Sequence, residues 1–386
     1  MVLSGRQASR QIPVVLVVVV ALTSLYQSIQ VTNIPRGVLT VESIARQQRL
    51  ELSPLCEVSC SLPKWMQDYF RWHKERLAEI STPNEWLQQN ILVVRCLEGD
   101  RCGGTADRLK SLPLYLALAA RTRRLLFFRW TRPFALESFM SPYQLNWTIP
   151  EALGPLLNSA NVTGEFFGAQ AMKRMVKSAY KEQLWNLEAA AQFTGGDIFK
   201  NLVAELNEPS PDDPSFFFHE MFLAIFRPSP ALETLIESQM QSLNLRPNQF
   251  VTAHIRAKYP GEVYRETWNV TLLQSVVSNA VDCAAFLSSS ELPVYVAADS
   301  LVSLEAAQNY HRQMALPYRV VSHADLNTLP HQDPPHLNFA EEEDPSAFFS
   351  IFCDLFIMSQ SRCVAFGAGG FGRFGSMVSF NSSCQV

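Results

Sequence analysis

A histidine and an arginine stand at the end of a predicted strand in the second half of the sequence. The run Phe250–Arg256 is mostly apolar and contains His254 and Arg256. A guanidinium at the carboxyl end of a strand keeps its charge and can bind a diphosphate through two parallel hydrogen bonds. His254 and Arg256 are therefore candidate anion-binding residues. A surface arginine beside a buried structural histidine is the alternative interpretation.

Two glycine-rich segments join predicted strands to predicted helices. One runs from Gly99 to Lys110 and the other from Gly367 to Arg373. Glycine lets the backbone turn sharply and lets a ligand approach closely, and the free N–H groups at a helix start attract phosphate. A tight structural turn is the alternative for the first segment. The second has the form G-x-G-x-x-G, but few residues follow Arg373 in this sequence, so we do not expect a nicotinamide-dinucleotide site.

Acidic residues near these segments supply candidate hydrogen-bond acceptors and bases. Asp299 follows the predicted strand Val294–Ala298 and can accept hydrogen bonds from a nucleoside, a helix cap being the alternative role. Asp100, Asp107 and Glu262 are candidates to orient or deprotonate an acceptor hydroxyl. No D-x-D triplet occurs in the sequence. We therefore expect no metal site, with arginine and helix ends supplying the positive charge.

The elements that would position these residues alternate between strands and helices. Strands are predicted at Ile91–Leu97, Leu125–Trp130, Phe250–Arg256, Val294–Ala298, Tyr318–Val321 and Cys363–Phe366. Helices are predicted at Ala106–Arg121, Ala231–Leu243, Thr271–Leu287, Leu301–Met314 and Ala347–Ser359. The segment 165–245 is expected to be mostly helical. This alternation predicts the α/β fold class, with doubly wound sheets in two halves and a ligand cleft between them at the carboxyl ends of the strands.

The composition is that of a globular protein rather than a nucleic-acid-binding one. Hydrophobic residues make up 47% of the 386 residues, charged residues 18%, and the net charge is -4. That much apolar side chain can bury two cores. Because the net charge is slightly negative, we expect no nucleic-acid partner.

The N-terminal region carries the pattern of a membrane anchor. Arg6 and Arg10 precede a charge-free stretch from Gln11 to Pro35, whose apolar centre is Val14 to Leu22. Positive residues before an apolar segment hold that end in the cytosol, so the remainder would enter the lumen. We expect a cytosolic tail at 1–11, a transmembrane signal anchor at 12–28 and a stem at 29–85. A cleaved signal peptide is the competing interpretation.

Cysteines and glycosylation sequons favour the same compartment. All eight cysteines follow the apolar segment, and their even number fits disulfide bonds in an oxidising lumen. Zinc binding by Cys56 with Cys60, or by Cys96 with Cys102, is disfavoured because no histidine lies at ligand spacing. Four Asn-x-Ser/Thr sequons add to the lumenal assignment, and they lie at Asn146, Asn161, Asn269 and Asn381.

In their order along the chain, these segments resemble the fucosyltransferases of GT-B fold, a superfamily with α1,6-fucosyltransferases, protein O-fucosyltransferases and plant and algal relatives. Gly103-Gly104 with Asp107-Arg108-Leu109-Lys110 is similar to their G-x-G-[DN]-R-L-K loop, and His254-Ile255-Arg256 to their H-x-R motif. Asp299 matches an acid near the guanosine, and Ser359 to Arg373 resembles the C-terminal donor motif. The second arginine of many members is Ala257 here.

The resemblance implies two Rossmann-like domains facing a central cleft, an acceptor-side domain at 86–245 and a nucleotide-sugar-binding domain at 246–386. It implies that the donor-binding residues are His254, Arg256, Asp299, Gly369, Gly370, Phe371, Arg373, Gly103, Gly104 and Arg108. The catalytic candidates are Arg256, Glu262 and Asp107. No cofactor is expected besides the donor substrate.

The expected function is an inverting, metal-independent transfer of fucose from GDP-fucose to a glycan or protein hydroxyl. The expected location is the Golgi or endoplasmic reticulum membrane, as a single-pass type II protein with a lumenal catalytic part. Two alternatives remain open at this point: a GT-B transferase with another nucleotide sugar, and a catalytically silent lumenal binding protein of the same fold.

Overall fold

The computed structural model describes most of the chain after the predicted anchor and stem. The described residues are 62–98, 100, 102–159, 186–190, 218–256, 270–287, 291–323, 344–367 and 369–381. All of them belong to one compact unit, Val58–Val386. The predicted cytosolic tail, the anchor and most of the stem lie outside the described residues. Within the described part, no helix is both long enough and apolar enough to cross a bilayer.

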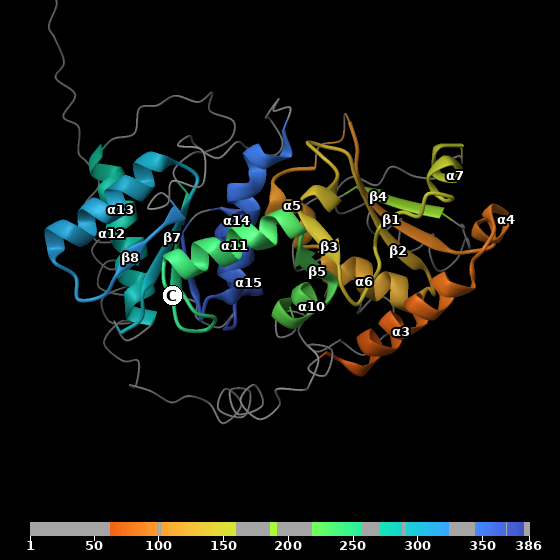
Figure 1. Ribbon diagram of the computed structural model, residues 1–386, viewed down its shortest axis with the longest axis horizontal. Coiled ribbons are helices and arrows are strands. Elements are labelled where there is room, and N and C mark those ends of the chain that lie inside the picture. Colours follow the sequence, from red (N-terminus) through yellow and green to blue (C-terminus); the bar gives the residue numbers. More distant parts are fainter. Residues whose placement is uncertain are drawn as a thin grey trace, which may run out of the picture. The chain divides into compact units, whose positions relative to one another are not determined.

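The first sheet has three parallel strands in the order β2-β1-β4 (Figure 1). Their bounds are β1 Ile91–Cys96, β2 Leu125–Trp130 and β4 Asn186–Ala190. Ile91 pairs in register with Leu125 on one side and with Asn186 on the other. The predictions for β1 and β2 are confirmed, whereas β4 lies in a segment that was expected to be mostly helical.

Two helices, rather than the single one predicted, connect β1 to β2. They are α5 Thr105–Leu109 and α6 Leu112–Arg121. Pro113 explains the break, because proline has no N–H to donate to the carbonyl group of Leu109 four residues earlier. The proline instead lies in the first turn of α6, where its missing donor costs nothing.

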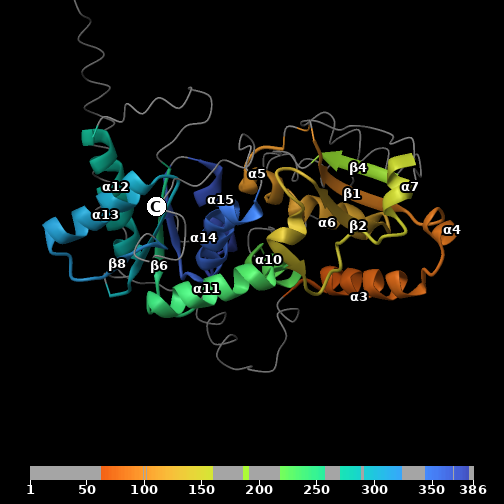
Figure 2. The same ribbon diagram turned by 45° about the horizontal axis from the view of Figure 1, so that its top comes forward.

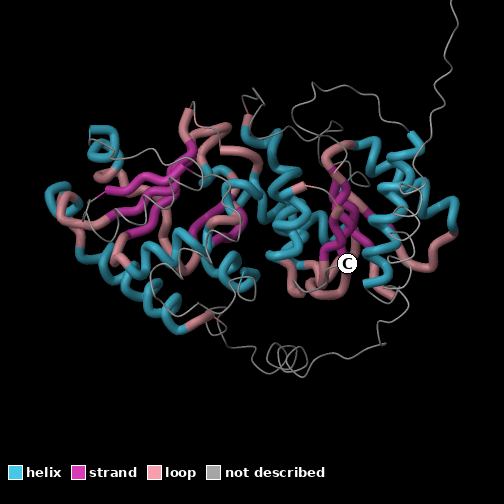
Figure 3. The backbone as a smooth tube through the Cα atoms, turned by 180° about the vertical axis from the view of Figure 1, so that it is seen from behind, coloured by secondary structure: helices cyan, strands magenta, loops and turns pink. Residues whose placement is uncertain are grey.

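The second sheet has four parallel strands in the order β8-β7-β6-β9. The strands are β6 Val251–Ile255, β7 Val294–Ala298, β8 Val320–Val321 and β9 Val364–Phe366, all within the predicted ranges. The helices of this half are α12 Val270–Leu287, α13 Leu301–Met314, α14 Phe349–Gln360 and α15 Gly370–Val378. Figure 3 shows the two groups of strands, each with helices beside it.

Both sheets are buried on two faces, as parallel sheets require. In β1, Leu92 and Val94 belong to one hydrophobic cluster while Ile91 and Val93 belong to another. In the second sheet, α12 and α13 cover one face, and α14 and α15 lie on the other (Figure 2). The strands therefore read as continuous apolar runs, which is why their positions could be predicted.

The two halves share one hydrophobic cluster. It combines residues of β1 and β2 with residues of α14, α15 and the connecting elements. The rings of Phe139 and Phe352 stack with 4.1 Å between centroids. The connecting elements are β3 Met140–Pro142, antiparallel to β5 Phe226–Pro228, and the helices α10 Phe218–Ile225 and α11 Pro230–Ser242.

A helix of the first half lies inside the range predicted as stem. It is α3 Lys64–Glu79, and it buries Met66, Tyr69, Phe70 and His73 on one side. The hydroxyl group of Tyr69 donates to the carbonyl oxygen of Arg124 at 2.9 Å, so α3 is fixed beside the start of β2. The remaining short helices are α4 Pro83–Trp86, η2 Leu136–Ser138, α7 Gly154–Ser159 and η5 Pro345–Phe348.

Candidate functional site

The strand orders place two predicted glycine-rich segments at topological switch points. From β1 the chain passes to β2 on one side and later to β4 on the other side. From β6 it passes to β7 and β8, and returns to β9 on the opposite side of β6. Ligands of open α/β sheets bind at such points, beyond the carboxyl ends of the strands. The loop after β1 and the loops after β6 and β9 all lie there.

These loops meet where α15 contacts α5. A Cβ atom added to Gly370, at the start of α15, would lie 3.8 Å from Cβ of Ala106 and 3.8 Å from Oδ1 of Asp107. The structure therefore brings together the two glycine segments, which are more than 250 residues apart in the sequence. The start of α15 therefore lies next to the first residues of α5.

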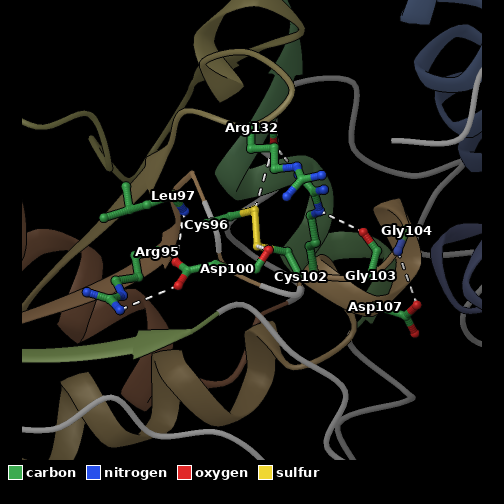
Figure 4. The surroundings of a disulfide bond; sticks show 10 residues. Arg95, Cys96, Leu97, Asp100, Cys102, Gly103, Gly104, Asp107 and Arg132 are labelled. Atoms are coloured by element: carbon green, nitrogen blue, oxygen red, sulfur yellow. Dashed lines mark hydrogen bonds and ion pairs between the residues drawn. A yellow bond between two sulfur atoms is a disulfide. The ribbon is translucent and has the colours of Figure 1, made fainter. Parts of the chain in front are cut away.

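The first loop is shaped by Gly103 and Asp107 (Figure 4). Gly103 has a φ angle of +71°, in the left-handed region where a Cβ is unfavourable, and an added Cβ would lie 2.7 Å from Cβ of Asp107. The backbone N–H of Gly104 donates to Oδ2 of Asp107 at 3.2 Å. Lys110 approaches the other carboxylate oxygen at 2.8 Å. Asp107 is thus fixed at the rim of the loop and partly exposed.

A disulfide bond and a buried ion pair close the same loop. Cys96, the last residue of β1, is bonded to Cys102. Asp100 accepts from the N–H of Leu97 at 2.9 Å, and its other oxygen lies 3.5 Å from the Arg95 guanidinium, with both side chains only 9% exposed. The predicted disulfide chemistry is confirmed here. Cys363 is also disulfide-bonded, whereas Cys283 and Cys353 are free thiols.

Arg108, a predicted donor-binding residue, points into the protein. It is 1% exposed, and its Nε donates to the carbonyl oxygen of Gly103 at 3.0 Å. Nη1 donates to the carbonyl oxygen of Arg132, and the guanidinium lies 5.1 Å from the ring centre of Trp130. Burial, together with the nearby charge of Arg132, lowers the pKa of Arg108 to about 9.

Arg256 lies at the end of β6 between Gly369 and Asp299. Its Nε is 3.7 Å from Oδ2 of Asp299, which follows the neighbouring strand β7. Gly369 has a φ angle of +101°, and a Cβ there would lie 3.0 Å from Cδ of Arg256. The side chain is 17% exposed, so its charge is partly desolvated and still accessible. The structure thus brings together Arg256, Asp299, Gly369 and Gly370.

His254 is buried below Arg256 and packs against α15. Its Nδ1 would be 2.5 Å from a Cβ added to Gly372, so only glycine fits at that turn of the helix. The ring of Phe371 lies 5.5 Å away. Burial lowers the pKa of His254 to about 4, against a smaller opposing effect of Asp354. His254 is therefore neutral at physiological pH and faces the helix rather than solvent.

A buried polar group lies next to His254 that the sequence did not point to. Asp354, in the middle of α14, is 4% exposed and accepts a hydrogen bond of 2.5 Å from the hydroxyl group of Tyr295. Nδ1 of His323 lies 3.5 Å from the same carboxylate oxygen. The signal in the sequence was that Asp354 is the one charged residue of a largely apolar helix. The group links β7, α14 and the end of β8 beneath the site.

The other predicted site residues differ in how far the structure describes them. Arg373 is exposed on α15. Glu262 lies outside the described residues, so its place relative to Arg256 is not described. Among the described residues, no group of three or more His, Cys, Asp or Glu side chains is arranged to hold a metal ion.

Of the comparisons with known proteins, the one with solved structures finds similar proteins. No family model matches the sequence, and no curated protein matches it. Among solved structures, the fold is similar to that of a mutant of the fucosyltransferase FUT1 from Arabidopsis thaliana in complex with GDP. The TM-score is 0.52 at 11% sequence identity, over 82% of this chain and 77% of that one. The fold of the chain is therefore α/β with parallel sheets, and it is similar to the fold of this GT-B fucosyltransferase structure.

Proposed function

We propose that the protein is an inverting, metal-independent glycosyltransferase that moves fucose from GDP-fucose to a hydroxyl group of a glycan or a protein. The observation that carries the proposal is the position of Arg256, at a switch point, between Gly369 and Asp299, where α15 meets α5. A partly buried guanidinium beside the start of α15 is suited to bind a diphosphate. The similar FUT1 structure contains GDP, which supports a nucleotide donor.

Arg256 would act on the leaving group. When the bond between the sugar and the diphosphate breaks, negative charge grows on the diphosphate oxygens. A fixed guanidinium stabilises that charge more in the transition state than in the ground state, and this difference accelerates the reaction. Asp299 holds Arg256 in place through the contact at Nε, which leaves the terminal nitrogens to face the diphosphate.

The acceptor hydroxyl would approach from the first-half side of the site. Inversion needs the hydroxyl to attack the anomeric carbon opposite the diphosphate while a base removes its proton. Asp107 is the described acid nearest to Gly370. Its two oxygens already accept from Gly104 and Lys110, which suits it to orient the hydroxyl group. Glu262 remains the second candidate for the base.

Donor specificity tests the proposal directly. Full-length protein in detergent is incubated with GDP-fucose, other GDP-sugars and UDP-sugars, and the released nucleotide is measured. We expect GDP release from GDP-fucose, and a melting temperature that rises with GDP rather than UDP. A preference for UDP-sugars would make the protein a different sugar transferase. Stabilisation by GDP without turnover of any donor would make it a catalytically silent binding protein.

Metal independence is a separate expectation that follows from the sequence. Because no D-x-D triplet occurs, the diphosphate would be neutralised by arginine and helix starts. We expect full transfer activity in EDTA. Loss of activity in EDTA, with recovery on addition of manganese, would contradict this mechanism while leaving the choice of donor open.

A further inference from the structure

The loop between β1 and α5 is held by links that do not themselves reach the site. The Cys96–Cys102 disulfide ties it to the end of β1. Arg108 ties it to the end of β2, because its guanidinium donates to the carbonyl oxygens of Gly103 in the loop and Arg132 beyond the strand. In Figure 4 the disulfide and Arg132 lie on one side of the loop, with Gly104 and Asp107 on the other.

Arg108 contacts the backbone of the loop and acts on its position. At 1% exposure its guanidinium is closed off from solvent, and its described hydrogen bonds go to carbonyl oxygens. Burying a guanidinium costs free energy, which its hydrogen bonds to carbonyl oxygens offset. The element fixed by these bonds is the turn at Gly103, which begins the helix that carries Asp107.

We propose that Arg108 and the Cys96–Cys102 disulfide are positioning groups, which hold the β1–α5 loop so that Ala106 and Asp107 lie against Gly370. The kinetic part of this proposal rests on the proposed function. Sub-ångström to ångström displacements of groups that orient a substrate lower rates strongly. Neither group needs to touch the donor or the acceptor, because both act on the position of α5.

Arg124 offers a matched comparison within the same sheet. It is also 1% exposed, and its Nη1 donates to the carbonyl oxygen of Ile91 at 3.2 Å. Burial lowers its pKa to about 10, so it resembles Arg108 electrostatically. It lies at the amino end of β1, however, whereas Arg108 lies at the carboxyl end. Loss of either arginine removes a buried guanidinium bound to backbone, but only loss of Arg108 should disturb the site.

The experiment compares four variants. Two are the single changes Arg108→Met and Arg124→Met, the third is the double serine variant Cys96→Ser/Cys102→Ser, and the fourth combines Arg108→Met with the two serine changes. For each full-length variant we would measure kcat and KM for GDP-fucose, the melting temperature, and hydrogen exchange of peptides covering residues 97–110. Arg108→Met and the serine variant should each lower kcat/KM about 10-fold to 100-fold. The combination should lose no more than the larger single effect, because both changes release one loop.

Arg124→Met should lose thermal stability as Arg108→Met does, with kcat/KM and exchange at 97–110 unchanged. Two results together would overturn the proposal: losses of kcat/KM that add up in the combined variant, and an effect of Arg108→Met on KM alone. They would mean that Arg108 contacts the donor directly. Equal kinetic losses in the two arginine variants would also overturn the proposal. If the wild-type protein transfers no sugar, the proposed function fails, but hydrogen exchange still tests the positioning role. Faster exchange at residues 97–110 in Arg108→Met, but not in Arg124→Met, would support that role. Equal exchange in the two variants would contradict it.

Discussion

At the scale of single residues, Arg256 is the group on which the proposed chemistry depends. Replacing Arg256 by alanine removes a charge-assisted contact to the diphosphate, and we expect a cost of about 3–4 kcal/mol, or about 10²–10³ in kcat/KM. Arg256→Lys should be intermediate, because lysine keeps the charge but loses the paired hydrogen bonds. Steady-state kinetics with GDP-fucose measures both, and thermal unfolding controls for folding. Near-normal turnover in the alanine variant would remove Arg256 from the mechanism.

Two buried histidines make stability depend on pH. Burial lowers the pKa of His73 to about 4 and that of His254 to about 4, from 6.5. Because the folded pKa lies below the unfolded one, the unfolded chain binds protons that the folded protein does not. The free energy of unfolding therefore falls as pH drops from 6.5 towards 4, by about 2 kcal/mol for each histidine at pH 5.

Denaturant unfolding at pH 8 and pH 5 measures this dependence. His73→Gln should remove about half of the histidine contribution, because glutamine does not titrate and its amide can still donate to the carbonyl oxygen of Leu126, which His73 contacts at 3.3 Å. For each protein, the comparison uses the difference between the free energies of unfolding at pH 8 and at pH 5. A loss of packing that is the same at both pH values therefore cancels. An unchanged difference in the variant would show that His73 is not held neutral.

The residue scale also shows what a sequence can supply for a site. Arg256, Asp299 and the glycines could be identified because each follows an apolar strand, and parallel strands place their carboxyl ends together. Asp354 and His323 could not, because the contact between them depends on α14 lying under the second sheet. The buried orientation of Arg108 could not be predicted either. A helix that is broken at Pro113 and a continuous helix expose different side chains.

At the scale of elements, the packing of α15 against β6 sets a test. A Cβ on Gly372 would lie 2.5 Å from Nδ1 of His254 and 2.7 Å from Cβ of Phe366, so neither neighbour can yield easily. We expect Gly372→Ala to destabilise the protein by about 1–3 kcal/mol, as over-packing does. Gly367→Ala is the matched control, because nothing lies within 4 Å of its added Cβ. Equal melting temperatures for the two variants would contradict the close packing of α15.

The elements differ in how far local sequence decides them. Apart from β4, the strands of both sheets are mostly apolar, contain β-branched or aromatic residues, and fall in the predicted ranges. The strand β4 has the sequence Asn-Leu-Glu-Ala-Ala, which has little intrinsic preference for a strand. Pairing with β1 decides its conformation, and that is a tertiary effect. In α3, by contrast, Met66, Tyr69, Phe70 and His73 have helical spacing, so the signal was present in the predicted stem.

At the scale of the whole molecule, we propose that the folded part lies in an oxidising, glycosylating compartment. The Cys96–Cys102 disulfide lies at the carboxyl end of β1. Asn146 is exposed, and its Oδ1 accepts from the hydroxyl group of Thr148 at 2.7 Å, while Trp147 between them is fully buried. The predicted sequon at Asn146 is therefore open to a glycan without disturbing the core, which gives a reporter for the side of the membrane.

The predicted anchor leads to the last test. Arg6 and Arg10 should stay on the cytosolic side, and the charge-free stretch to Pro35 can cross the bilayer with its few polar residues near the interface. We expect the full-length protein to remain in membranes after washes with high salt and with carbonate. In sealed vesicles, residues 62–381 should resist added protease. Once detergent has opened the vesicles, endoglycosidase should shift the mobility of the wild-type protein more than that of Asn146→Gln.

Each outcome of this test separates one part of the topology from another. A mature N-terminus near Val31 would favour a cleaved signal peptide, and the protein would then leave the membrane in carbonate while keeping its glycans. Digestion in sealed vesicles would place the folded unit in the cytosol, where glycan addition does not occur and structural disulfides are rare. The proposal of a transferase that acts on secreted glycans would then be wrong about the compartment, even if Arg256 binds GDP. The charge pattern of the first 35 residues predicts protection, because positive residues that precede an apolar span direct the C-terminal remainder of the chain across the membrane.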